Sequence, residues 1–223
     1  EDAARLFGIM AGKEIELPAP KSVKGLTFAI LKTVAMEHVV DLPKKAFRNS
    51  IDKLEKAGAK ISEITVLSVN EAMDLTRFLY SPEAYATWKH KIEKSPDLMF
   101  EKILERFRSG ADVLASDFIR AWDKLMDLRQ QYHSSVQAFD AILIPTSPII
   151  PPERDRLMND GDFYNAQNLL ALRNTRIGNL MGGCSITLPT DIPSCGILIM
   201  GRPNEEERLL RLAQACELVL AKN

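Results

Sequence analysis

The residues best suited to chemistry in this chain lie between Phe139 and Gly201, where short apolar runs alternate with polar side chains. Thr146 and Ser147 follow the apolar run Ala141–Ile144 directly. Because loops that follow buried strands collect binding residues, these two hydroxyls are candidates for contact with a substrate. The alternative is that they only cap a turn. This stretch holds no complete set of catalytic groups, so we expect it to form one wall of a pocket.

A polar helix is predicted inside this stretch, and it carries guanidinium, hydroxyl and amide groups. Thr175 and Asn179 are four residues apart, which places them on one face of a helix. They are candidates for ligand contact, although the asparagine could equally satisfy backbone groups of a neighbouring loop. Arg173 and Arg176 could bind a carboxylate on the substrate, since guanidinium groups pair with carboxylates through two parallel hydrogen bonds. The alternative is a pair of solvent-facing helix charges.

Cys184, in the sequence GGCS at 182–185, is the candidate for a thiol nucleophile. A catalytic thiol needs a histidine within hydrogen-bonding distance, and His133 is the best placed of the three histidines. His133 belongs to an amphipathic helical pattern, however, which favours a structural role. The three cysteines sit in or beside apolar segments, as expected of buried thiols in a reducing, cytoplasmic compartment. The histidines lie far from one another and from the cysteines, so we expect no metal site.

Periodicity predicts a single α/β unit over residues 1–223. Strands are expected at 26–31, 60–66, 141–144, 185–188 and 196–200, helices at 1–11, 41–57, within 70–140, at 165–180 and after Pro203, and a loop at 17–22. The strand–helix–strand segment 26–66 has the pattern of a crossover between parallel strands. The run 141–144 is apolar enough to be a central strand.

The longest predicted helix lies within residues 70–140. Ser116 and Asp117 offer an N-cap for it. Its expected apolar face consists of Phe118, Trp122, Leu125, Met126, Tyr132 and Val136. Trp88, in EAYATW, could line an acyl channel as an apolar wall, or it could be buried in the core.

Composition excludes several classes of protein. The hydrophobic content of 46% and the charged content of 26% are those of a folded globular chain. The formal net charge of -1 predicts no attraction to nucleic acid or to an acidic membrane. No apolar run approaches the roughly 18 residues of a membrane span. The start, EDAARLFG, is neither a signal peptide nor an initiator methionine, and we expect a piece of a longer protein.

The motifs along the chain resemble, in order, the second half of the amidase signature hydrolases. FDAILIPTSPIIPP is similar to the family pattern DA.L.PT.P..AP, and NTRIGNLMGGCSITLP to T…N..G.P.I..P. GILIMG followed by ERLLRLAQACE matches the family's GL.L.G…E..LL..A...E. EDAARLFGIMAG, LTFAIL and KAFRNSIDKLEKAGAKISEI resemble the preceding helix, strand and helix–strand unit. LRNT and EAYATW resemble more narrowly the bacterial amidases related to those that act on small amides and ureido compounds.

This resemblance implies a mixed β-sheet flanked by helices, the C-terminal part of the amidase signature fold. Family members hydrolyse carboxamides with a lysine, a bridging serine and a nucleophilic serine, helped by an oxyanion hole of backbone amides. These groups precede the region that the chain matches, so we expect no catalytic residue within it and no activity from it alone. GGCS falls on the family's G.P.I turn, not on its nucleophile. Cys184 and Ser194 stand at or near common family prolines, which leaves substrate preference open.

The resemblance also sets expectations for ligands and partners. The substrate would be a small-molecule amide, without a cofactor, and the full-length protein could be a homodimer. Two other functions stay open. One is a non-catalytic scaffold or binding module with the amidase fold. The other is the glutamine-hydrolysing subunit of an amidotransferase, which would need further subunits as partners.

Overall fold

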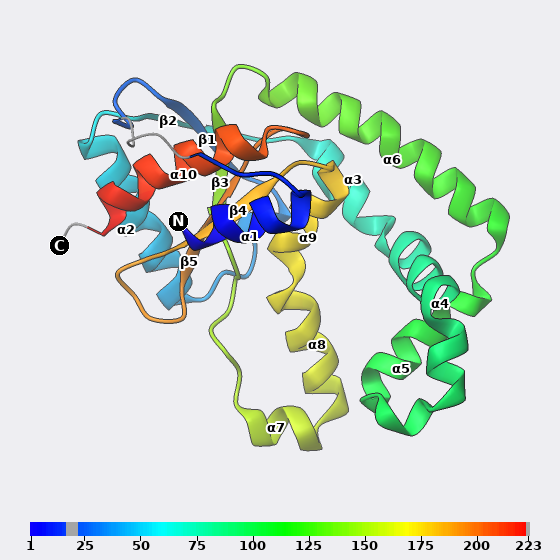
Figure 1. Cartoon of the computed structure of the whole chain (residues 1–223). Helices are drawn as coiled ribbons and strands as arrows, with labels where there is room; N and C mark the ends of the chain where they lie inside the picture. The colour runs from blue at the N-terminus through cyan, green and yellow to red at the C-terminus, as the bar shows by residue number, and fades with distance from the viewer. Residues whose placement is uncertain (17–21, 222–223) are drawn as a thin grey trace.

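The computed structural model describes residues 1–16 and 22–221, so the loop expected at 17–22 lies, except for Ser22, outside the described residues. Its centre is a five-stranded sheet in the order β2-β1-β3-β5-β4 (Figure 1). The strands are β1 Thr27–Leu31, β2 Lys60–Ile64, β3 Ala141–Pro145, β4 Ser185–Pro189 and β5 Gly196–Met200. β1 pairs in parallel with β2 and β3, whereas the β3–β5 and β5–β4 pairs are antiparallel. The expected mixed sheet is therefore confirmed.

The exposure of each strand follows from its composition. Every residue of β3 is buried, and β3 lies at the centre of the sheet, as its apolar run predicts. At one edge, β2 exposes Lys60 and Glu63, and charges on an edge strand discourage pairing with another sheet. At the other edge, β4 exposes Ser185, Thr187 and Pro189 and carries no charge. The two edges of the sheet thus differ in chemistry.

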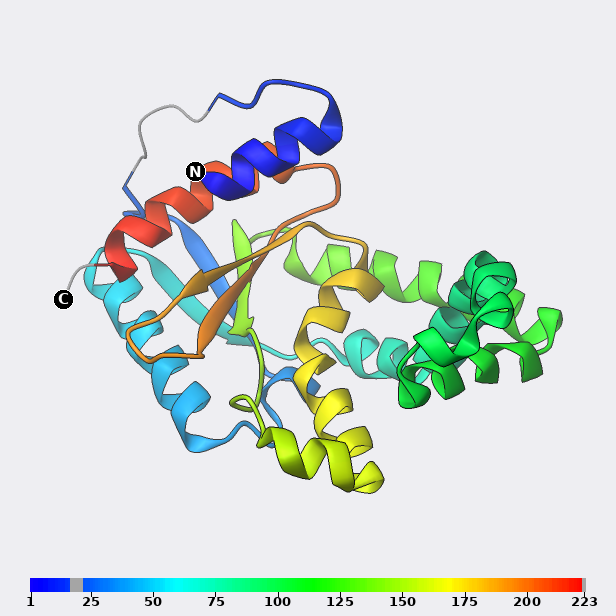
Figure 2. The ribbon, with the colours of Figure 1, turned by 60° about the horizontal axis from the view of Figure 1, so that its bottom comes forward.

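Helices cover both faces of this sheet (Figure 2). The α-helices are α1 Asp2–Ala11, α2 Asp41–Lys56, α3 Leu67–Asp74, α4 Thr76–Lys94, α5 Glu101–Arg108, α6 Ala115–Val136, α7 Arg154–Asn159, α8 Gly161–Ala171, α9 Arg173–Met181 and α10 Glu206–Leu220. Short 3₁₀ turns occur at η1 Val34–Met36, η2 Pro96–Leu98 and η3 Ser109–Asp112. The sheet is therefore the middle layer of the molecule.

Two hydrophobic cores form because successive strand side chains point to opposite faces. Phe28 and Ile30 of β1 pack in the core that contains the buried residues of α2 and α10. Ala29 and Leu31 pack in the other core, with buried residues of α3, α6 and α9. The helix expected after Pro203 is α10, and its buried apolar residues recur at helical spacing: Leu209, Leu212, Ala213, Cys216 and Leu220.

Helices α4 and α5 form a helical lobe that extends away from the sheet (Figure 1). In this lobe, η3 packs against α4. A Cβ atom on Gly110 would overlap the carbonyl group of Ser81, which belongs to the backbone and cannot move aside as a side chain could. Glycine at position 110 is therefore required for the helices of this lobe to approach one another.

The structure corrects three details of the predicted helices. The N-cap expected at Ser116 and Asp117 is wrong, because α6 begins at Ala115 and the residue before it is extended, without a side-chain cap. Met126 is 55% exposed and so does not belong to the apolar face, since it lies one residue off the buried positions. The helix expected at 165–180 is two helices, α8 and α9, which meet at Leu172.

Candidate active-site wall

The edge of the sheet that collects the loops of interest is here called the carboxyl edge. It consists of the carboxyl ends of β1, β3 and β4 together with the amino end of β5. The register places these ends side by side, because Pro145 pairs with Ile197 and Pro189 pairs with Gly196. Such an edge is where ligands bind in open α/β sheets.

Thr146 and Ser147 lie at this carboxyl edge, as expected for residues that follow β3. The Ser147 hydroxyl donates to the carbonyl oxygen of Ile149 at 3.0 Å and accepts from the amide of the same residue at 3.3 Å. That pattern is a serine turn, so the Ser147 hydroxyl is committed to its own loop. The Thr146 hydroxyl, which is half-buried, donates instead to the hydroxyl of Thr187 on β4 at 3.3 Å. Thr146 therefore joins the end of β3 to the exposed strand β4.

Arg173 is buried, with 7% of its surface exposed, and its donors point at backbone. Its Nη2 donates to the carbonyl oxygen of Glu37 at 2.7 Å and to that of Ala35 at 3.3 Å. Burial lowers the pKa of the Arg173 guanidinium, and the negative charge of Glu37 opposes this shift. The side chain thus fixes the loop after β1, and the solvent-facing alternative does not describe it.

Asn174 is a residue that sequence reasoning missed, and it connects the parts of the carboxyl edge. Its side chain is fully buried. The amide nitrogen donates to the carbonyl oxygens of Ala35 at 3.0 Å and of Pro145 at 2.7 Å. The amide oxygen accepts from Arg173 Nε at 3.1 Å. Asn174 therefore ties the start of α9 to the ends of both β1 and β3. Sequence reasoning selected Arg173 and Thr175 from LRNT, and nothing in this motif indicated that the side chain of Asn174 between them would be buried.

Thr175 and Asn179 lie farther along α9. The Thr175 hydroxyl donates to the carbonyl oxygen of Leu172 at 3.1 Å, a bond within the first turn of its own helix. Asn179 is exposed, six residues after Arg173 and about 9 Å along the helix axis. The carbonyl oxygens of Asn179 and Leu180 accept from Arg129 of α6. The structure thus places Asn179 near the far end of α9, away from the residues at the carboxyl edge.

Trp88 lies on α4 in the helical lobe and does not meet the other candidates at the carboxyl edge. It is 47% exposed, and the ammonium of Lys91 lies 4.9 Å from its ring centroid. Core burial therefore does not describe it. The exposed indole ring is available for contact with another molecule or segment beside α4.

Cys184 and His133 do not form a nucleophile–base pair. The Cys184 thiol donates to the carbonyl oxygen of Arg202 at 3.0 Å, whereas His133 Nε2 lies 3.0 Å from the carbonyl oxygen of Met181. Burial raises the pKa of the Cys184 thiol, and Glu206 raises it further. The geometry therefore gives no support to a thiol mechanism.

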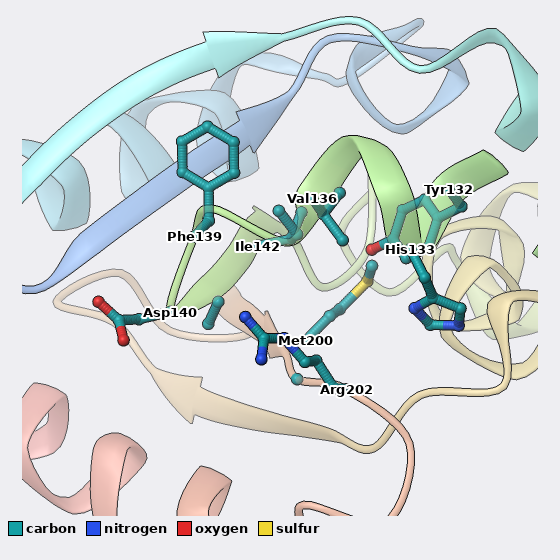
Figure 3. Close-up of a pocket in the computed structure, with 10 residues that line it drawn as sticks. Tyr132, His133, Val136, Phe139, Asp140, Ile142, Met200 and Arg202 are labelled. Atoms are coloured by element: carbon teal, nitrogen blue, oxygen red, sulfur yellow. The ribbon is translucent and has the colours of Figure 1, made fainter. Parts of the chain in front are cut away.

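The pocket in Figure 3 lies at the end of the sheet opposite the carboxyl edge, next to the start of β3 and the end of β5. Tyr132, His133 and Arg202 line it, and its volume is about 10 Å³. That space holds about one water molecule, so it is not a substrate site. Larger hollows of about 190 and 240 Å³ flank β4 where this strand meets α10.

Metal-binding clusters and membrane-spanning helices do not occur in the described part of the chain. Residues 1–16 and 22–221 contain no group of three or more His, Cys, Asp or Glu side chains arranged to hold a metal ion. Within the same ranges, no helix is long and apolar enough to cross a bilayer.

Curated proteins resemble the chain along almost its whole length. The 2-amino-5-chloromuconic acid deaminase of Comamonas testosteroni is 27% identical over 236 residues, which cover 100% of this chain and 50% of that protein. An amidase of Pseudomonas putida is 27% identical over 237 residues, covering 97% of this chain and 50% of the relative. A glutamyl-tRNA(Gln) amidotransferase subunit of Sulfurisphaera tokodaii is 25% identical over 259 residues, covering 99% and 53%. The chain thus spans about half the length of the curated relatives that it matches.

A solved structure shares the fold. The crystal structure of an amidase superposes with a TM-score of 0.76 at 20% identity, covering 99% of this chain and 51% of that one. The family model described as amidase matches residues 6–210, which is most of the chain. The chain belongs to the amidase family.

Proposed function

We propose that this chain is part of an enzyme that hydrolyses the C–N bond of a small carboxamide through an acyl-serine intermediate. The match to the amidase family over residues 6–210 carries this proposal. The serine, bridging serine and lysine would lie in a segment beyond the 223 residues, and relatives about twice as long leave room for it. The serine relay would supply nucleophile and proton transfer, so the reaction would need no metal or organic cofactor.

In this proposal the chain supplies one wall of the substrate pocket at the carboxyl edge. Thr146 and Ser147 form the loop of that wall after β3, and Arg173 anchors it from α9. Thr175, Asn179 and Trp88 would line more distant parts of the pocket. The catalytic segment would pack along β4, because this edge is uncharged and the Thr146 hydroxyl reaches Thr187 on it. The three free thiols suit a cytoplasmic location.

The test is ammonia release from a panel of small amides by two proteins. One is the longer gene product that contains this sequence, and the other is residues 1–223 alone. We expect turnover by the longer protein only, because an acyl-serine needs all three catalytic groups. Turnover by residues 1–223 alone would refute the placement of the triad outside the chain. Absence of turnover by both would favour the scaffold module.

A second candidate function is the glutamine-hydrolysing part of an amidotransferase, since a relative named as a glutamyl-tRNA(Gln) amidotransferase subunit covers 99% of the chain. Such a protein would release ammonia from glutamine and work together with further subunits. Glutamine as the preferred amide, together with co-purifying subunits, would identify it. Sedimentation of the longer protein as a homodimer without other subunits would instead agree with a free-standing amidase.

A further inference from the structure

Two arginines from different helices converge on neighbouring residues of α8. Arg106 of α5 donates through Nη1 to Asn168 Oδ1 at 2.8 Å. Arg176 of α9 donates through Nη2 to the carbonyl oxygen of Leu169 at 3.4 Å. Neither guanidinium forms an ion pair with a carboxylate of the described residues. Each guanidinium has five N–H donors, so most of those on both side chains remain available.

The two arginines create an excess of positive charge on this part of the molecule. Burial lowers the pKa of the Arg176 guanidinium. The Tyr80 side chain opposes that shift, and the positive charge of Arg106 adds to it. Bringing two like charges together at half-buried positions is unfavourable unless an anion lies between them. The arrangement therefore favours an anionic ligand.

Tyr80 of α4 adds a hydroxyl to the same place. Burial raises the pKa of this hydroxyl, while Arg176 and Arg129 lower it. Glu83 is the carboxylate that acts on it, and it raises the pKa. The hydroxyl is therefore protonated at neutral pH and can donate. Arg129 itself is committed to the end of α9, where its Nε donates to the carbonyl oxygen of Leu180 at 2.6 Å.

Helix α9 connects this cluster with the carboxyl edge of the sheet. Arg176 lies three residues after Arg173, which is about 4.5 Å along the helix axis. Arg173 and Asn174 hold the loops that end β1 and β3. In Figure 1, α8 and α9 face the lobe of α4 and α5, and the bond between Arg106 and Asn168 spans this gap. A ligand held by the two arginines would thus reach toward the candidate wall.

We propose that Arg106 and Arg176, together with the Tyr80 hydroxyl, bind a carboxylate group of the substrate. The substrate class would be amides whose acyl part ends in a carboxylate. A planar carboxylate matches the fork of a guanidinium, which gives orientation as well as affinity. This inference rests on the proposed amidase function, because it assigns the substrate of the same pocket.

The test compares two amides of equal length in the longer protein. Succinamate ends in a carboxylate, whereas butyramide ends in a methyl group. The variants are Arg106→Gln and Arg176→Gln, which keep a polar side chain and remove the charge. Arg48→Gln is the matched control, since Arg48 is exposed on α2, on the other side of the sheet. Thermal melts confirm that each variant is folded.

We expect kcat/KM for succinamate to fall about 10- to 100-fold in each of the two variants, the range for a charge-assisted hydrogen bond. Butyramide turnover should change less than about 3-fold, and Arg48→Gln should change neither. An equal loss for both amides, or no loss for succinamate, would overturn the inference while leaving the amidase proposal intact. If neither amide is hydrolysed, the proposed amidase function is refuted. Calorimetric measurement of succinate binding then tests the carboxylate site by itself. Binding that Arg176→Gln abolishes supports the site, and undetectable binding refutes it.

Discussion

Replacing Asn174 by alanine should destabilise the protein more than any other single asparagine substitution on α9. The change removes two donated bonds, to the carbonyl oxygens of Ala35 and Pro145, and one accepted from Arg173. Each net hydrogen bond contributes about 1 kcal/mol, and unpaired buried groups add a penalty of about 1–3 kcal/mol. The sum is a loss of about 4–6 kcal/mol in the free energy of unfolding. The effect is large because the amide is fully buried, so water cannot replace it.

Urea unfolding of the longer protein, followed by circular dichroism, measures this loss. With an m-value of about 3 kcal/mol/M, the urea midpoint should fall by about 1.3–2 M. Asn179→Ala on the same helix is the control, since that side chain is exposed, and it should shift the free energy by less than about 0.5 kcal/mol. If both variants lose the same small amount, Asn174 does not hold the ends of β1 and β3 together, and the account of the carboxyl edge is wrong.

Two further predictions concern packing and thiol chemistry. Gly110→Ala should lower the thermal midpoint, at a cost of about 1–3 kcal/mol, because its Cβ would overlap the carbonyl group of Ser81. Gly161→Ala is the control, since its nearest neighbour is the end of the flexible Lys102 side chain at 3.5 Å, and equal melting of both variants would contradict the packing at η3. Burial raises the pKa of the Cys216 thiol to about 12, so at pH 8 it should resist iodoacetamide in the folded protein and react after unfolding. Mass spectrometry of the labelled peptides checks this, and rapid labelling of native Cys216 would contradict its burial.

Patterns that depend on neighbours in the sequence predicted their elements well. The apolar runs LTFAIL and AILI indicated buried strands, and β1 and β3 occupy those positions. The stripe after Pro203 predicted α10 because its apolar residues recur at helical spacing. The start of α6 was mispredicted, because a serine or an aspartate caps a helix only when its own backbone is extended, and Ser116 and Asp117 already lie inside the helix. Here the extended residue is Leu114.

The candidate site was harder to predict, because its contacts join residues far apart in the chain. Asn174 reaches Pro145 across 29 positions and Ala35 across 139. Nothing local distinguishes this amide from that of Asn179, although one is buried and the other exposed. The same reason hid the pair formed by Arg106 and Arg176, since only the approach of α5 to α8 and α9 brings their charges together.

The contrast between the two edges of the sheet has a consequence for handling the protein. The charged side chains of Lys60 and Glu63 discourage another strand from pairing with β2 at that edge of the sheet. The uncharged β4 offers unused N–H and C=O groups to any strand that approaches, including β4 of another copy. Residues 1–223 produced alone should therefore self-associate through β4, and the average molar mass measured by light scattering should rise with concentration. A charge introduced at the exposed Thr187 would be the simplest way to keep such a sample monodisperse.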